Sequence, residues 1–277
     1  MQIIGKENTT YLLLSGIEVP DEIMLGDNVK LLPADTSHLD FKTAIATCSR
    51  PDDIAVVAAF IPRITAQLKI DAPTPKELAT LAWNTSWDAL LLSAIFNTEV
   101  GFNLQSDTEA SLISAQTNLH ATNYHFHGFT QEVSRTLNSD DVNWVKVHFN
   151  EARLLLDIEK FQTAVHCLAS YRWHSMPRIK MAVLWAGIEG MFGASTEIRF
   201  RISLYISRFL HPVDADARKV TFEAVKKLYN SRSSAVHGSK TKADMAQAVE
   251  ESAELLKQLI RKSIENRAIP DEEKLAP

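Results

Sequence analysis

Residues 177–193 read PRIKMAVLWAGIEGMFG, and their apolar positions recur with the period of an α-helix. Proline is tolerated in the first turn of a helix, because the amide hydrogen that it lacks has no partner there, so Pro177 can begin this helix. Glycine commonly follows the last helical residue, so Gly193 is expected to end it. The apolar residues that the helix is expected to bury are Ile179, Val183, Leu184, Ile188, Met191 and Phe192.

Helical patterns continue on both sides of this stretch. The other expected helices run from Asp140-Asp141 to about Trp173, from the N-cap Ser195 to Leu210, from Asp214 to Gly238 and from Lys242 to about Arg267. Short connections between amphipathic helices are typical of an antiparallel bundle. The sequence therefore predicts an all-α antiparallel helical bundle over residues 141–268, followed by a charged tail over residues 269–277.

The first 140 residues predict a small α+β region of unknown role. Residues 64–70 alternate between apolar and polar side chains, which indicates a strand, and Gly26-Asp27-Asn28 between two short apolar runs indicates a hairpin. The rest of the first third reads as sheet and turn. A helical face begins at Pro75 and ends near Asn97, and further strands or extended loops follow. The chain is thus predicted to be mainly helical overall, with an α+β region preceding the bundle.

Charge is distributed unevenly along the chain. Residues 1–149 hold 9 Lys and Arg against 18 Asp and Glu, whereas residues 150–277 hold 20 against 16. This difference favours two modules, of which the second is the candidate for contact with a polyanion. The chain contains no phosphate-binding loop, dinucleotide-binding glycine motif, zinc-protease motif or serine-hydrolase elbow, so these enzyme classes are disfavoured.

The sequence predicts a cytoplasmic protein that does not enter a membrane. Its first residues lack the basic segment and the long apolar core of a secretory signal. The longest apolar run, Ile54–Ile61, is far shorter than the roughly 20 residues of a membrane-spanning helix. Cys48 and Cys167 stand far apart and outside any C-x-x-C motif, so two reduced thiols are expected.

The candidate functional residues lie near the end of the helix expected from Asp214, where residues 228–238 read LYNSRSSAVHG. Arg232 supplies a planar, permanently charged group that matches phosphate oxygens. His237 exchanges a proton near neutral pH, because the unperturbed pKa of histidine is about 6.5. Five residues of a regular helix turn through about 500°, so these side chains converge only if the helix unwinds at His237 or a second chain supplies half of the site. The alternative is that both are capping groups at the helix end.

The pattern L-Y-x-x-R-S-x-x-V-H-G over residues 228–238 resembles the signature of HEPN domains (higher eukaryotes and prokaryotes nucleotide-binding), in particular the ApeA-like branch. The resemblance extends over about residues 145–266. It includes residues 186–192, AGIEGMF, which look like the glutamate-bearing helix of that branch, and the helix over Arg199–Phe209 that follows. The number and order of the expected helices are also similar.

This resemblance implies a function in RNA cleavage. Active members of the family are metal-independent endoribonucleases that need no cofactor, and many act in phage defence or as toxins in stress systems. They are often dimers, in which two Arg-x4–6-His motifs meet in a shared cleft. The implied partners are RNA and a second copy bound through the bundle. The resemblance implies no function for the N-terminal region; we expect it to sense a trigger or to restrain the nuclease, with a regulatory protein or a phage component as the further partner.

The family also implies a role for each motif residue. Arg232 would stabilise the scissile phosphate, and His237 would transfer a proton as the 2′-hydroxyl attacks phosphorus, leaving a 2′,3′-cyclic phosphate and a 5′-hydroxyl. Ser233 stands where nucleases of the wider family often carry Asn, Asp or His, which leaves the catalytic strength open. The residues that would orient the phosphate or contact the arginine are Tyr229, Asn230, Ser233 and Glu189.

Two other functions are compatible with the sequence. Some HEPN proteins are not nucleases, so the bundle is alternatively a non-catalytic module that binds RNA, a nucleotide or a partner protein. The third hypothesis is an N-terminal metal enzyme centred on His120, His125 and His127, with the bundle serving for dimerisation. Imidazole is a common zinc ligand, but no nearby carboxylate or cysteine completes a recognised pattern.

Overall fold

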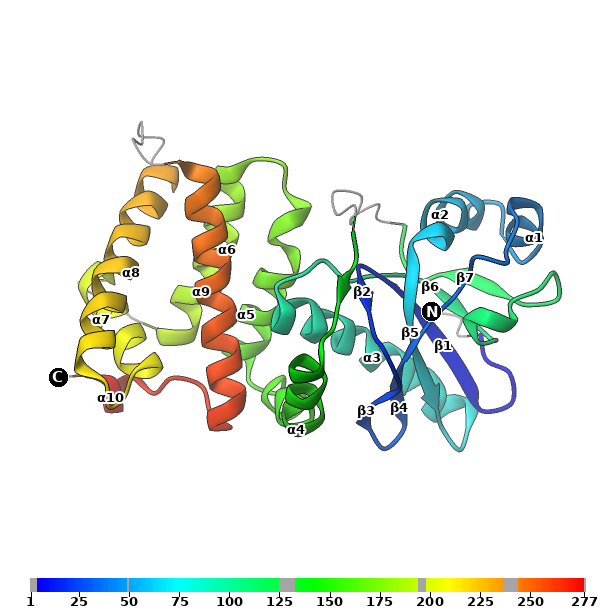
Figure 1. Cartoon of the computed structure of the whole chain (residues 1–277), viewed down its shortest axis with the longest axis horizontal. Helices are drawn as coiled ribbons and strands as arrows, with labels where there is room; N and C mark the ends of the chain where they lie inside the picture. Colours follow the sequence, from blue (N-terminus) through cyan, green and yellow to red (C-terminus); the bar gives the residue numbers. More distant parts are fainter. Residues whose placement is uncertain (1–3, 49, 125–132, 194–197, 237–243, 277) are drawn as a thin grey trace. The chain divides into compact units, whose positions relative to one another are not determined.

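The chain divides into two compact units (Figure 1). The computed structural model describes residues 4–48, 50–124, 133–193, 198–236 and 244–276. Unit 1 comprises Met1–Leu92 and Thr98–Asn150, and unit 2 comprises Ser93–Asn97 and Glu151–Pro277. Within the described residues, no helix combines the length and the apolar character that a membrane crossing requires.

Unit 1 is built on a six-stranded sheet in which every neighbouring pair is antiparallel, with the order β3-β4-β5-β1-β6-β7. Its strands are β1 (Thr9–Ser15), β3 (Ile23–Gly26), β4 (Val29–Pro33), β5 (Ile64–Asp71), β6 (Gly101–Ser106) and β7 (Leu119–Ala121). The hairpin and the alternating strand that the sequence predicted are confirmed as β3–β4 and β5. A second, two-stranded sheet pairs β2 (Ile17–Glu18) with β8 (Arg135–Thr136) in parallel.

Helices cover both faces of the large sheet. They are α1 (Phe41–Ala46), α2 (Asp53–Phe60) and α3 (Pro75–Phe96). Successive side chains of a strand point to opposite faces, so neighbouring leucines of β1 are buried against different helices. Leu13 belongs to an apolar cluster with side chains of α1 and α2, whereas Leu12 lines a pocket with Ala82 and Trp83 of α3. The sheet is therefore the middle layer of three.

The sequence predicted only sheet and turn before Pro75, and this prediction was wrong for α1 and α2. Helix α2 is apolar at almost every position. It therefore lacks the recurrence of apolar residues every three to four positions, between polar ones, by which an amphipathic helix is recognised. Its residues Val56, Val57 and Phe60 are buried in the cluster beneath the sheet. Tertiary packing decides the structure of such a segment.

Unit 2 is helical. Its helices are α5 (Glu159–Ser170), α6 (Pro177–Phe192), α7 (Ile198–Leu210), α8 (Ala215–Val236), α9 (Met245–Asn266) and α10 (Glu272–Leu275). Gly193 ends α6 in the left-handed conformation at φ 65°, as predicted. Asp214 caps α8 by accepting a hydrogen bond from the Ala217 amide at 2.9 Å. Asp244 caps α9, and the expected N-cap Ser195 lies outside the described residues.

The single helix expected from Asp140 to Trp173 is divided in the structure. Helix α4 (Ser139–Leu155) ends where residues 156–158 form tight turns, in which each amide donates to the carbonyl three residues earlier. Ile158 is extended, α5 follows it, and a 3-10 turn (Tyr171–Trp173) ends the segment. No glycine or proline marks this break, so the apolar periodicity did not reveal it.

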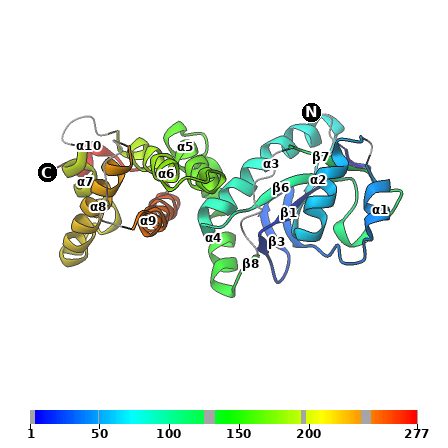
Figure 2. The ribbon, with the colours of Figure 1, turned by 90° about the horizontal axis from the view of Figure 1, so that it is seen from above.

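Helix α6 is the central element of unit 2. It packs against α5, α8 and α9, and Trp185 and Ile188 on it are fully buried. These helices run side by side in Figure 1, and α9 is seen nearly end-on in Figure 2. A Cβ atom on Gly187 would lie 2.9 Å from the Cβ of Cys167 and 3.1 Å from Cδ2 of Leu256. The glycine therefore allows α6 to approach both α5 and α9 closely.

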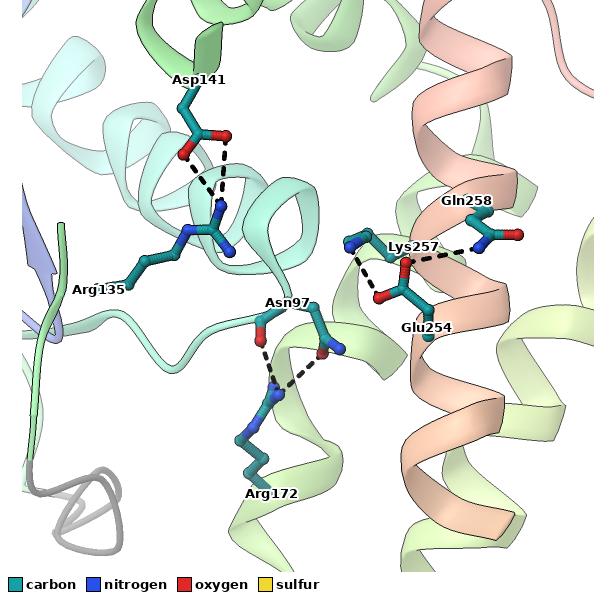
Figure 3. Close-up of polar contacts among 7 residues, drawn as sticks. All are labelled: Asn97, Arg135, Asp141, Arg172, Glu254, Lys257 and Gln258. Atoms are coloured by element: carbon teal, nitrogen blue, oxygen red, sulfur yellow. Dashed lines mark hydrogen bonds and ion pairs between the residues drawn. The ribbon is translucent and has the colours of Figure 1, made fainter. Parts of the chain in front are cut away.

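The last turn of α3 belongs to unit 2 and is held there by an arginine (Figure 3). Asn97 follows α3 with φ 47°, a conformation that asparagine tolerates better than most residues. Arg172 donates hydrogen bonds through Nη2 to the carbonyl and the side-chain oxygen of Asn97, both at 2.8 Å. The cation also interacts favourably with the negative end of the helix dipole.

The charged tail contains the short helix α10. Arg208 on α7 donates through Nη1 to the carbonyl oxygens of Leu275 and Ala276, at 2.7 and 2.6 Å. These bonds attach the end of the described chain to α7.

Two glycines of α6 provide a matched test of this packing. We expect Gly187→Ala to lower the free energy of unfolding by about 1–3 kcal/mol, because the added methyl group overpacks the contacts with α5 and α9. Gly190→Ala is the control: apart from its chain neighbours and the nearby backbone of α6, no described atom lies within 4 Å of its added Cβ, so helix propensity should raise stability by roughly 0.5–1 kcal/mol. Urea denaturation measures both, and equal effects of the two substitutions would contradict the packing.

Candidate functional site

The candidate arginine of the sequence motif forms an ion pair between two helices of unit 2. Arg232 lies on the last turns of α8, and its Nη2 is 3.0 Å from Oε2 of Glu189 on α6. Their side chains are 23% and 25% exposed, so solvent reaches the pair but does not surround it. The structure thus brings together two of the residues that the sequence selected, 43 positions apart.

Aromatic contacts hold this arginine in place. Its guanidinium carbon lies 5.5 Å from the ring centre of Tyr229, one helical turn earlier on α8. The Tyr229 ring meets the buried Trp185 ring edge to face, with centroids 5.3 Å apart. Trp185 in turn donates through Nε1 to Oγ of Ser252 on α9, at 3.1 Å. A continuous series of contacts therefore connects α9 with the guanidinium, which fixes its position before any ligand arrives.

The ion pair leaves hydrogen-bonding capacity unused. Oε1 of Glu189 and Nε of Arg232 are both buried, and neither has a hydrogen-bond partner among the described residues. Burial raises the pKa of Glu189 above its ordinary value, and the positive charge of Arg232 opposes this shift. Within the described residues, the hydrogen bond to Glu189 uses only Nη2 of the guanidinium, so the other N–H groups of Arg232 are the candidates for binding an additional anion.

The other selected residues occupy different positions around the pair. Asn230 is exposed and faces α7, where its Oδ1 accepts a hydrogen bond from Nη1 of Arg199 at 3.1 Å. Ser233 is half-buried, one residue after Arg232. His237 lies outside the described residues, because α8 is described only to Val236.

Three contributors to the site were missed in the sequence. They are Trp185 and Ser252, which support Tyr229, and Arg178, whose Nη1 donates to the Ala235 carbonyl at 3.2 Å. Arg178 thus places a second cation at the end of α8. Trp185 and Glu189 are four residues apart, and Tyr229 and Arg232 are three apart, so each pair shares a helix face. That spacing was a usable signal for the aromatic contacts, whereas no sequence pattern connects residues 178 and 235.

The histidines of the metal hypothesis cannot be compared as a group, because His125 and His127 lie outside the described residues. Nδ1 of His120 lies 3.3 Å from Oδ2 of the fully buried Asp53. The other oxygen of Asp53 accepts a hydrogen bond from the Tyr124 hydroxyl at 2.6 Å. Among the described residues, no three His, Cys, Asp or Glu side chains gather in a way that would hold a metal ion.

Positive charge is concentrated on the helices next to the ion pair. Residues 198–236, which contain α7 and α8, hold 8 Lys and Arg against 3 Asp and Glu. Helix α9 has no such excess, with 3 against 4. The mild basic balance of the second half of the chain therefore comes from the α7–α8 pair.

Comparison of the chain with protein-family models, with curated proteins and with solved structures finds no match in any of the three.

The ion pair predicts a pH-dependent loss of stability when its cation is removed. At pH 7, Arg232→Met should lower the free energy of unfolding by about 1–2 kcal/mol, between the values for exposed and fully buried pairs. Arg232 lowers the pKa of Glu189, which burial raises, so the folded variant without Arg232 binds a proton at Glu189 more readily than the folded wild type. The loss should therefore shrink as the pH falls towards 4.5, the ordinary pKa of the group.

Urea denaturation between pH 4.5 and 7.5 measures this effect. The control is the double variant Glu189→Gln with Arg232→Met, compared with Glu189→Gln alone. Without the carboxylate, the cost of removing Arg232 should no longer depend on pH. A loss that is equal at all pH values would contradict the coupling between the two side chains.

Proposed function

We propose that the chain is a metal-independent endoribonuclease of the HEPN type, and that unit 2 has the HEPN fold. The observation that carries the proposal is the position of Arg232. Its guanidinium is held by Glu189 and Tyr229, remains partly exposed, and precedes His237 by five residues. A preorganised cation near a histidine is the arrangement that metal-free cleavage of a phosphodiester needs.

The proposed reaction is a transesterification within the RNA strand. The 2′-hydroxyl loses its proton and attacks the adjacent phosphorus, the bond from phosphorus to the 5′-oxygen breaks, and that oxygen takes up a proton. Arg232 stabilises the negative charge that develops on the phosphoryl oxygens, and His237 transfers a proton. The products are a 2′,3′-cyclic phosphate and a 5′-hydroxyl. Tyr229 and Glu189 position the arginine, and Ser233 lies close enough in sequence to assist the phosphate.

Charge supports RNA as the substrate. The excess of Lys and Arg over residues 198–236 lies on α8, which carries Arg232, and on the neighbouring helix α7. Because phosphate contacts dominate the affinity of proteins for nucleic acids, this excess favours binding of RNA next to Arg232.

A homodimer completes the proposed site. A regular helix directs residues 232 and 237 to different sides, so two copies that join through unit 2 would combine the arginine of one with the histidine of the other. We propose that the protein acts in phage defence or in a toxin or stress system. In this proposal, unit 1 senses a trigger or a regulatory protein and holds the nuclease at a basal rate of cleavage until then.

One observation favours a second function. Glu189 already occupies part of the Arg232 guanidinium, at 3.0 Å, so a phosphate has to share this cation with a carboxylate. A structural ion pair of this kind suits a non-catalytic module that binds RNA, a nucleotide or a partner protein.

Cleavage of total cellular RNA distinguishes the two functions. In the presence of EDTA, we expect the wild-type protein to produce fragments that end in cyclic phosphate. His237→Ala and Arg232→Ala should each reduce cleavage at least a hundredfold, because each removes a group that acts only in the transition state. His211→Ala, a histidine of the same unit at the end of α7, is the matched control and should cleave like the wild type.

The ends of the products and the folding of each variant are measured together, by end mapping and circular dichroism. Equal cleavage by the wild type and His237→Ala would contradict the site. Binding of RNA without any cleavage would favour the non-catalytic module.

A further inference from the structure

An exposed aromatic pair lies on the surface of α7 and α8, which run side by side (Figure 1). Phe200 on α7 is 53% exposed, whereas Phe161 and Phe192 of the same unit are fully buried. Its ring meets the partly buried ring of Phe222 on α8, with centroids 5.7 Å apart and an interplanar angle of 75°. The two rings therefore present apolar, aromatic area to solvent.

Cations border this pair. Nζ of Lys226 lies 5.5 Å from the ring centre of Phe222 and 3.4 Å from the exposed carboxylate of Glu223. Arg199 precedes Phe200 on α7 and reaches across to Asn230 on α8. We call Arg199, Phe200, Phe222 and Lys226 the aromatic–basic face.

The aromatic–basic face and the candidate site lie along the same side of α8. Phe222, Lys226 and Tyr229 are spaced four and three residues apart, so they share one side of the helix. Tyr229 contacts Arg232 through its ring. With a rise of about 1.5 Å per residue, Arg232 lies about 15 Å further along α8 than Phe222. A ligand that follows this side of α8 would pass from the aromatic pair to the arginine.

Charge and ring chemistry identify the class of ligand. Proteins bind single-stranded nucleic acids through aromatic rings on which bases stack and through cations that neutralise phosphates. An interface with a second protein chain would instead be depleted in lysine. Residues 198–236 carry an excess of five positive charges, with 8 Lys and Arg against 3 Asp and Glu, which suits a polyanion.

We propose that the aromatic–basic face binds a single-stranded segment of RNA, a few nucleotides away from the phosphate at Arg232. A base stacks on the exposed ring of Phe200, which the ring of Phe222 supports at an interplanar angle of 75°, and the neighbouring phosphates pair with Lys226 and Arg199. The choice of RNA rests on the proposed function, but the binding itself does not require cleavage. This face makes the enzyme prefer single-stranded segments, because bases inside a duplex are not free to stack on protein rings.

A binding assay with an uncleavable probe tests the face separately from the nuclease. The probe is a fluorescent 2′-O-methyl oligoribonucleotide, which lacks the 2′-hydroxyl that the reaction needs, and anisotropy measures its affinity. Phe200→Ala should weaken binding between about fivefold and a hundredfold, the range for the loss of one stacking contact. Phe200 is exposed, so the variant should fold. Lys226→Ala should weaken binding less and reduce its dependence on salt.

Phe41→Ala is the matched control, because Phe41 is a 64% exposed phenylalanine of unit 1. It should bind the probe like the wild type. Equal affinities of Phe200→Ala and Phe41→Ala, absence of any binding by the wild type, or equal binding of a 2′-O-methyl duplex would each overturn the proposal. If Phe200→Ala turns a dimer into a monomer in sedimentation without changing affinity per chain, the face is an interface between copies and the proposal also fails.

The outcomes for the face and for the nuclease remain distinguishable. If the probe binds through Phe200 but total RNA stays intact, the face is supported and the nuclease is not. If His237-dependent cleavage occurs while Phe200→Ala binds normally, the nuclease is supported and the face is not.

Discussion

The close approach of three helices at Gly187 is the constraint on which unit 2 depends. Only a residue without a Cβ lets α6 lie against Cys167 of α5 and Leu256 of α9 at these distances. This approach buries Trp185 completely and leaves its indole within hydrogen-bonding distance of Ser252. The same helix then presents Glu189, one turn after Trp185, to α8. The packing of the core and the position of the charged pair are therefore consequences of one arrangement, because residues on a rigid helix cannot be moved independently.

In the candidate site, the pair of Glu189 and Arg232 stabilises the fold and also offers a cation to an anionic ligand. Burial raises the pKa of Glu189, and its carboxylate is paired with an arginine that has a further N–H donor without a partner among the described residues. Replacing water by fixed protein groups strengthens electrostatic interactions, so an anion that reaches Arg232 would be bound more firmly than by a surface lysine. The contacts with Tyr229 reduce the loss of side-chain entropy on binding, because the guanidinium is already held in place. The additional cation that Arg178 brings to the end of α8 acts in the same direction.

Sequence patterns predicted those elements in which apolar residues recur with a clear period. Strand β5, the β3–β4 hairpin and helices α3, α6 and α9 all have such a period, and their ends carry proline, glycine or capping residues. The two features that the sequence did not predict lack such a pattern. Apart from Asp53, helix α2 is apolar on all sides, and the break between α4 and α5 falls at residues 156–158, where there is no glycine or proline. In both places the local preferences are weak, and contacts with distant parts of the chain decide the outcome.

The sequence by itself determined the order of the two parts, the helical character of the second and the residues of the motif, because these depend on local periodicity, composition and spacing. Only the tertiary structure decided that Glu189 pairs with Arg232, that Trp185 and Ser252 support Tyr229, and that Arg178 meets the end of α8. It also decided that Phe200 and Phe222 meet on the surface while similar residues are buried. Each of these contacts joins residues far apart in the chain, and their side chains have no local preference that specifies a partner.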